Sequence, residues 1–189
     1  GVTRLRGVIG CAAAAGIPMV TLCTGSRNAA DQWAPHPDNT TPEAWADMRA
    51  AMAELAEMAE DAGVVLGIEP EQANVVRSVG DALRLAQELG TDRLRLILDP
   101  ANLFDHGSPA EVRKIVARAV DEAAPMLGLA HAKDRTPEGH VVPPGDGAVD
   151  FPDFVRRLAA AGYDGALVTH GIAEAEVAQT ARRLTAWLA

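Results

Sequence analysis

Short apolar runs alternate with amphipathic stretches along most of the chain. Five of these runs have the length of strands rather than of helices. They cover residues 19–24, 64–69, 94–99, 127–131 and 166–170. Runs that are buried on both faces and joined by helices are typical of parallel strands with right-handed crossovers, so the pattern predicts an α/β fold.

Residues that favour helix ends bound the segments between the runs. The predicted starts and ends are Thr40-Thr41-Pro42-Glu43 with Gly63, Ser78-Val79-Gly80-Asp81 with Gly90, the capping box Ser108-Pro109-Ala110-Glu111, and Asp150 with Gly162. Strand and helix therefore alternate, and no linker or low-complexity segment divides residues 1–189, which we expect to form a single domain.

Each of the last four runs ends in a residue able to bind a metal or a proton. These residues are Glu69, Asp99, His131 and His170, at intervals of 30, 32 and 39 residues. One unit per roughly 34 residues matches a (β/α)8 TIM barrel, whose active site lies at the carboxyl ends of its strands. A doubly wound sheet is the alternative, but no G-x-G-x-x-G loop follows a strand.

The length of the chain limits how much of a barrel it can form. Eight such units need about 250 residues, whereas this chain has 189. We therefore expect about the last five βα units of a TIM barrel rather than a closed one. Open sheet edges would need cover, so we expect either a homo-oligomer or a missing N-terminal segment.

Composition and charge limit which binding partners and which cellular location are expected. The net charge of −9 argues against nucleic acid, and no run is long and apolar enough to cross a membrane. Cys11 and Cys23 are too few for a disulfide scaffold, so a reducing, cytoplasmic location is expected. Residues 8–23 imitate a secretion signal, but Gly16-Ile17-Pro18 interrupts them and favours helix, loop and strand.

Two carboxylates and two imidazoles form a mixed oxygen and nitrogen donor set. Such a set suits one divalent ion of the Mn, Co, Zn or Fe type, or Mg with more water retained. Taken singly each residue has a structural explanation, because Asp99 before Pro100 can start a turn and a strand-end histidine can simply be hydrogen-bonded. Four of them at successive strand ends favour a metal site.

Four segments also match a known family. They are Gly67-Ile68-Glu69-Pro70-Glu71, Leu98-Asp99-Pro100-Ala101-Asn102-Leu103-Phe104, His131-Ala132-Lys133-Asp134, and Pro144-Gly145-Asp146-Gly147-Ala148-Val149-Asp150-Phe151. From about Thr21 to its C-terminus the chain resembles the xylose isomerase-like TIM barrels, the sugar phosphate isomerase/epimerase group that shares its fold with endonuclease IV. The H-x-K-D segment followed by P-G-x-G-x-x-D-F is the most specific element.

The resemblance implies a role for each strand-end residue. The family binds one divalent metal through Glu, Asp, His and Glu on its last four strands, and the two Glu also shuttle the proton. Glu69, Asp99 and His131 match this set directly, whereas His170 stands where the second Glu is usual. His170 can still ligate a metal or act as acid or base. Asn102 replaces a frequent histidine and can only hydrogen-bond a substrate hydroxyl.

Other candidates surround this set. Lys133 is a candidate catalytic cation that could hold a substrate oxygen, or it forms a surface salt bridge. Glu71 lies in the site mouth or faces water. In the loop after the first run, Arg27 and Trp33 could bind a sugar, or the loop is a packing lid with Trp33 and Trp45 in the outer helix layer.

The function expected is a metal-dependent isomerase or epimerase of a sugar, sugar phosphate, hydroxy-keto acid or inosose, with Glu69 as ligand and base. A dehydratase is chemically adjacent. The alternative is a catalytically impaired or truncated barrel that binds a ligand without turnover. An endonuclease IV-like phosphodiesterase is disfavoured, because its three-metal site needs more histidines than the five present.

Overall fold

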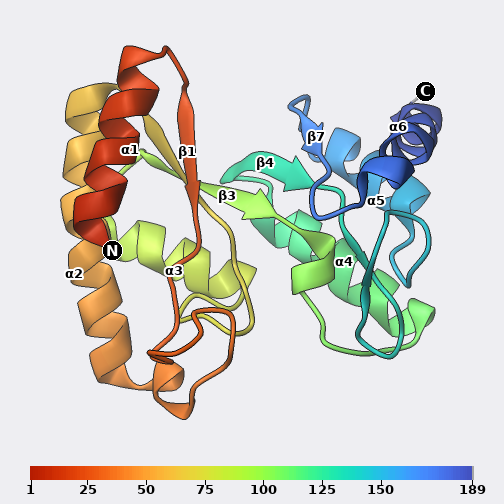
Figure 1. The fold of residues 1–189 in the computed structure, drawn as a ribbon, viewed down its shortest axis with the longest axis horizontal. Helices are drawn as coiled ribbons and strands as arrows, with labels where there is room; N and C mark the ends of the chain where they lie inside the picture. Colours follow the sequence, from red (N-terminus) through yellow and green to blue (C-terminus); the bar gives the residue numbers. More distant parts are fainter. Residues whose placement is uncertain (189) are drawn as a thin grey trace. The chain divides into compact units, whose positions relative to one another are not determined.

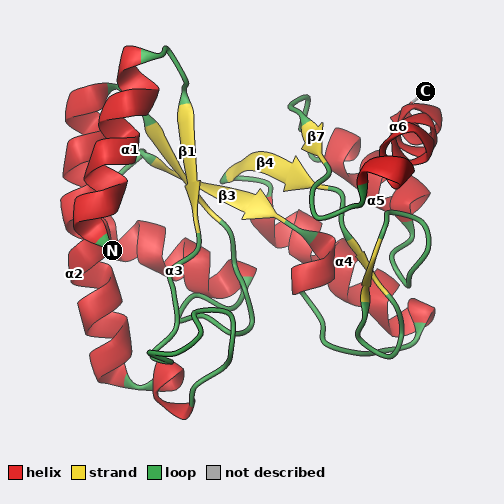
Figure 2. Cartoon of the chain, in the orientation of Figure 1, coloured by secondary structure: helices red, strands yellow, loops and turns green. Residues whose placement is uncertain are grey.

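The structure is a computed structural model that describes residues 1–188, and the chain divides into two compact units, Gly1–Ile97 and Leu98–Ala189. Both units combine parallel strands with helices (Figures 1 and 2). The predicted α/β class is therefore confirmed, and each unit is described by itself below.

The N-terminal unit carries three strands in the order β1-β2-β3, all parallel. Its elements are α1 (Val2–Ala14), β1 (Met19–Leu22), the 3-10 turn η1 (Pro37–Thr40), α2 (Pro42–Ala62), β2 (Val65–Ile68), α3 (Val79–Leu89) and β3 (Leu94–Leu98). Met19 pairs with Val65 and Leu66 with Leu94. The register places the carboxyl ends of β1 and β2 side by side, because Leu22 pairs with Ile68.

Helix ends in this unit follow the sequence signals. The Thr41 side chain accepts the Ala44 N–H and begins α2, and Gly63 ends it in the left-handed conformation at φ 66°. Ser78 begins α3 in the same way, and Gly90 at φ 61° ends it. A residue without a Cβ takes this conformation without strain, which explains why each helix stops where it does.

The sheet of this unit packs tightly because its central strand carries a glycine. A Cβ on Gly67 would lie 2.9 Å from the Ile97 Cδ1 atom and 3.0 Å from the Met19 sulfur. Leu66 and Ile68, on either side of it, are completely buried. The two strands that flank β2 can thus fill the space above Gly67 with their own side chains.

The C-terminal unit contains the parallel pair β4 and β7, in which Ala130 pairs with Leu167 and His131 with Val168. Its elements are η2 (Pro100–Asn102), α4 (Pro109–Ala123), β4 (Leu127–His131), β5 (Asp134–Arg135), β6 (Val141–Val142), α5 (Phe151–Ala160), β7 (Leu167–Val168) and α6 (Glu174–Leu188). The capping box at Ser108 and Glu111 and the Asp150 cap of α5 are present as predicted. The antiparallel hairpin β5–β6 was not predicted.

Asp134 organises the loop that follows the hairpin. Its carboxylate is completely buried and accepts four backbone N–H groups at 2.8 to 3.0 Å, those of Arg135, Gly145, Gly147 and Val149. Burial raises the pKa of Asp134, while the four donors favour its charged form. The Asp134 carboxylate therefore fixes the positions of its neighbours in this loop.

Helix α6 contacts the same loop. Arg183 Nη1 donates to the Pro144 carbonyl at 3.1 Å and to Asp146 Oδ1 at 2.7 Å. The Trp187 ring stacks on Phe151, with centroids 5.1 Å apart. The P-G-x-G-x-x-D-F segment is thus held between a buried carboxylate and the last helix.

The five strands of the βα repeats are all present within residues 1–188, three in the N-terminal unit and two in the C-terminal unit. The last of them, β7, has only two residues, although the sequence predicted five. Tyr163 explains part of the difference, because its hydroxyl accepts the Ala130 N–H at 3.1 Å and donates to the Ala166 carbonyl at 2.6 Å. No helix in the described part of the chain is both long and apolar enough to cross a membrane.

We predict that Gly147→Ala destabilises the protein by about 2 kcal/mol. An added Cβ would lie 2.3 Å from Asp134 Oδ1 and 2.5 Å from the Arg135 carbonyl oxygen, so the buried carboxylate would have to move. Urea unfolding followed by circular dichroism measures the effect.

The matched control is Gly7→Ala in α1, where the new Cβ meets nothing within 4 Å. This variant should gain about 0.5–1 kcal/mol from helix propensity. Equal free energies of unfolding for the two variants would contradict the role given to Asp134.

Candidate metal centre

Asp99 lies immediately after β3 and begins the 3-10 turn η2. Its Oδ1 atom accepts the Ala101 N–H at 2.9 Å, which fixes the carboxylate plane. The side chain is completely buried, and within residues 1–188 no hydrogen bond of acceptable geometry reaches its Oδ2 atom. A buried carboxylate oxygen in this state is costly unless a cation faces it.

Two histidines face this oxygen. His131 is the last residue of β4, and His170 follows β7, the strand paired with β4. His131 Nδ1 lies 3.6 Å and His170 Nε2 lies 3.7 Å from Asp99 Oδ2. The two ring nitrogens are 3.2 Å apart, and the rings meet edge to face with centroids 4.6 Å apart.

These three side chains fit a divalent ion. Each offers one ligand atom, and the three atoms lie within 4.8 Å of one another. A tetrahedral ion with bonds of about 2.1 Å separates neighbouring ligand atoms by about 3.4 Å, which is close to the separations of 3.2 to 3.7 Å found here. The combination of one carboxylate oxygen and two imidazole nitrogens suits Mn, Co, Zn or Fe.

Lys133 is also part of the centre. Its Nζ atom lies 2.8 Å from Asp99 Oδ2 and donates to Asn102 Oδ1 at 2.7 Å. Only 14% of its side chain is exposed, so the alternative of a surface salt bridge is wrong. Burial opposes ionisation of Asp99, but the facing histidine nitrogens and the Lys133 ammonium hold the pKa of this carboxyl well below its usual range.

Glu69 and Glu71 belong to the N-terminal unit. The Glu69 N–H donates to the Leu22 carbonyl at 3.0 Å, which places the residue at the carboxyl end of β2 as predicted. The Glu71 N–H bonds the Val76 carbonyl at 3.1 Å and closes the turn that follows. The participation of either carboxylate in metal or substrate binding stays a prediction.

The loop after β1 is held by contacts within the N-terminal unit. Arg27 forms an ion pair with Asp47 of α2 at 2.5 Å, and Trp33 is 59% exposed. Asn39, which is buried, holds the loop together by accepting the Arg27 N–H and donating to the Ala73 carbonyl. Trp45 lies in the helix layer, as the packing alternative predicted, whereas Trp33 does not.

Trp45 itself contacts two residues of α3. Its indole N–H donates to Glu88, and the Arg84 guanidinium lies 4.0 Å from its ring centroid. Sugar binding by Arg27 or Trp33 stays a prediction.

Sequence reasoning missed Arg135 as a residue that shapes the centre. Its Nε atom donates to the Ala101 carbonyl at 3.0 Å, and its Nη1 atom donates to the Gly139 carbonyl at 3.0 Å. Arg135 thereby ties the turn that carries Asp99 to the hairpin that follows His131. The only available signal was its place directly after the H-x-K-D segment.

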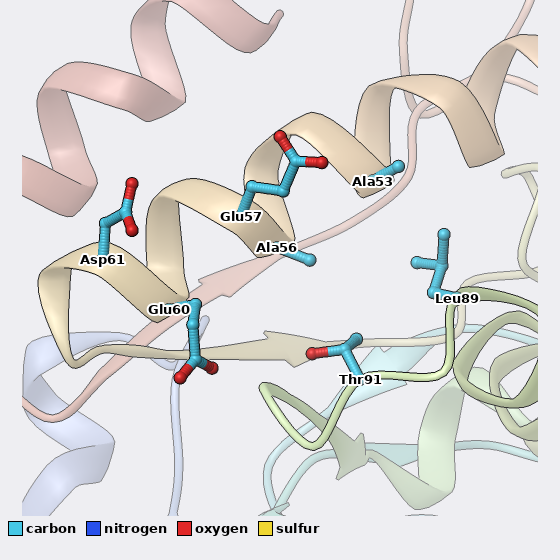
Figure 3. A pocket seen from close by; sticks show the side chains of 7 residues that line it. All are labelled: Ala53, Ala56, Glu57, Glu60, Asp61, Leu89 and Thr91. Atoms are coloured by element: carbon cyan, nitrogen blue, oxygen red, sulfur yellow. The ribbon is translucent and has the colours of Figure 1, made fainter.

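Another concave surface lies in the N-terminal unit, on α2 and the turn after α3 (Figure 3). This groove of about 320 Å³ is lined by Ala53, Ala56, Glu57, Glu60, Asp61, Leu89 and Thr91. Glu60 is already paired with Arg93. The lining contains no histidine or cysteine, so the groove lacks the mixed donor set found around Asp99.

The Asp99 pKa predicts how stability depends on pH. This pKa is lowered in the folded protein. The contribution of Asp99 to the free energy of unfolding is therefore fully present above the pKa of the unfolded chain, about 4, and is lost as the pH falls below it. We expect the free energy of unfolding to fall more steeply between pH 4 and pH 2 in the wild type than in Asp99→Asn. Urea unfolding across this range measures both slopes, and parallel curves would contradict the assignment.

Comparison with known proteins identifies the family of the chain. The family model described as xylose isomerase-like TIM barrel matches residues 1–189. The 3-dehydro-D-guloside 4-epimerase of Escherichia coli (strain K12) is 30% identical over 138 residues, which cover 71% of this chain and 49% of that protein. The L-ribulose 3-epimerase of Mesorhizobium japonicum is 29% identical over 126 residues, which cover 65% of this chain and 39% of that protein.

Solved structures share the fold. The crystal structure of a xylose isomerase-like TIM barrel protein from Mycobacterium smegmatis in complex with magnesium superposes with a TM-score of 0.69 at 17% identity. The match covers 100% of this chain and 68% of that one. The chain spans between 39% and 49% of the length of the curated relatives it matches. Because the family model matches residues 1–189 of this chain, the chain belongs to the xylose isomerase-like TIM barrel family.

Proposed function

We propose that this chain provides the metal-binding part of a sugar isomerase or epimerase. The observation that carries the proposal is the convergence of His131 Nδ1 and His170 Nε2 on the buried Asp99 Oδ2 atom. A divalent ion bound there would polarise a carbonyl or alkoxide oxygen of the substrate. The sugar epimerases among the relatives support a ketose or a keto-sugar as the substrate class.

Glu69 is proposed as the fourth ligand and as the base. It stands at the carboxyl end of β2, as Asp99 and His131 do at the ends of β3 and β4, and strand ends of this kind supply the active sites of TIM barrels. A carboxylate can take the proton from the carbon beside the substrate carbonyl and return it. Lys133 and Asn102, already in contact with each other, are proposed to meet a substrate oxygen.

His170 is proposed as the second proton-transfer group. With 44% of its side chain exposed, it is the most accessible of the three converging residues. An imidazole can both ligate a metal and exchange a proton near neutral pH. It replaces the second carboxylate of the family, so the two faces of the substrate carbon would meet unlike groups.

The competing proposal is a barrel part that binds a ligand without turnover. It is motivated by His170, which stands where the family usually has a glutamate. Exchange of substrate hydrogen with solvent separates the two, because only an active isomerase or epimerase breaks the C–H bond.

We predict that L-ribulose or D-fructose incubated with the protein in D2O and MnCl2 gains deuterium at the carbon beside the carbonyl. Glu69→Gln should lower this exchange at least about a hundredfold while weakening Mn²⁺ binding far less, because an amide keeps one oxygen donor but accepts no proton. Mass spectrometry follows the exchange, and EDTA-treated protein is the control. Exchange that survives in Glu69→Gln would remove this residue from the mechanism.

The variant His170→Glu tests the second proton-transfer group. If His170 has become the acid or base of this protein, the variant should lose at least about tenfold in exchange rate at neutral pH. If the chain has merely lost its second carboxylate, the variant should gain activity instead. The rates of both proteins are compared at equal Mn²⁺ saturation, measured by calorimetry.

A further inference from the structure

One oxygen of Asp99 faces both an ammonium group and two histidine nitrogens. Oδ1 is held by the Ala101 N–H at 2.9 Å. Oδ2 is therefore the atom left to face His131 Nδ1 and His170 Nε2, and it is the same atom that lies 2.8 Å from Lys133 Nζ. Any ion bound by the two histidines and Asp99 would share its carboxylate oxygen with an ammonium group.

The position of Lys133 is well defined. Asn102, 3% exposed, accepts a hydrogen bond from Nζ at 2.7 Å. Asp99 Oδ2, although close to Nζ, receives no hydrogen bond of acceptable geometry from residues 1–188. The ammonium thus compensates the charge of Asp99 from a distance of 2.8 Å, next to the two histidine nitrogens that face the same oxygen.

We propose that Lys133 is the counter-cation of the metal-free centre, which a divalent ion displaces from Asp99 and thereby makes available to the substrate. The inference rests on the proposed function. A buried carboxylate without a counter-charge is strongly destabilising, so a cation is needed before the metal arrives. Two cations at one oxygen repel each other, so binding of the metal weakens the hold of Asp99 on the ammonium.

This role has a consequence of definite sign for metal affinity. If Lys133 only supports the shape of the centre, its removal should weaken metal binding, because Asp99 would lose a contact. If Lys133 is a competing cation, its removal should strengthen metal binding. The two roles are therefore separated by the direction of one measured change.

The first measurement is calorimetric titration with MnCl2. We expect Lys133→Met to bind Mn²⁺ about tenfold more tightly than the wild type, since the methionine side chain has a similar length but no charge. Lys133→Arg keeps the charge and should stay within about threefold of the wild type. The matched control is Lys114→Met on the exposed face of α4, which should leave the affinity unchanged.

The second measurement uses the wild-type protein and does not depend on a variant that folds. Lys114 and Lys133 are the two lysines of the chain. Brief acetylation with an N-hydroxysuccinimide ester, quantified by peptide mass spectrometry, reports how freely each amine reacts. We expect the labelling of Lys133 to rise at least about threefold when MnCl2 replaces EDTA, while Lys114 stays constant as the internal reference.

The outcomes distinguish the inference from the proposed function. Tighter binding by Lys133→Met together with faster labelling of Lys133 supports the inference. If the wild type binds Mn²⁺ and a folded Lys133→Met variant binds it equally well or more weakly, the inference alone is overturned. Unchanged labelling of Lys133 also overturns the inference alone. Absence of Mn²⁺ binding in all four proteins overturns the metal-dependent function and the inference with it.

Discussion

The candidate centre depends on keeping a carboxylate ionised where water does not reach it. Asp99 is completely buried, and a charge in this position costs several kcal/mol unless other groups compensate it. The Ala101 N–H, the Lys133 ammonium and the two histidines supply this compensation from three different segments of the C-terminal unit. Three segments of the C-terminal unit, at residues 99–101, 131–133 and 170, therefore come together around one negative charge.

The same principle operates a second time, a few residues further along the chain. Asp134 is as buried as Asp99, but backbone N–H groups surround it in place of cations. The Asp134 carboxylate binds the N–H groups of a loop, whereas the Asp99 carboxylate faces side chains that could share a ligand with it. The two carboxylates thus have different roles because different donors face them. Backbone N–H groups are fixed and uncharged, whereas the Lys133 ammonium and the histidine rings are side-chain groups that can move.

Much of this arrangement follows from the sequence. Apolar runs and helix-end residues located the five strands and their connecting helices, and strand-end spacing identified Asp99, His131 and His170 as neighbours, because paired parallel strands bring their carboxyl ends together. The β5–β6 hairpin escaped prediction since strands of two residues show no periodicity. The direction of the Lys133 side chain and the tie made by Arg135 depend on tertiary contacts, which a local pattern does not contain.

The shortness of β7 affects how the centre holds its ligands. His170 follows a strand of two residues that is joined to β4 by the pairs at Leu167 and Val168. Such an element opens locally at a small free-energy cost, so its amide hydrogens should exchange early compared with those of β4. An ion that binds only the closed form stabilises it by about 2.7 kcal/mol at a free concentration a hundredfold above its Kd. Hydrogen exchange at Leu167 and Val168 would therefore act as a local gauge of ion occupancy.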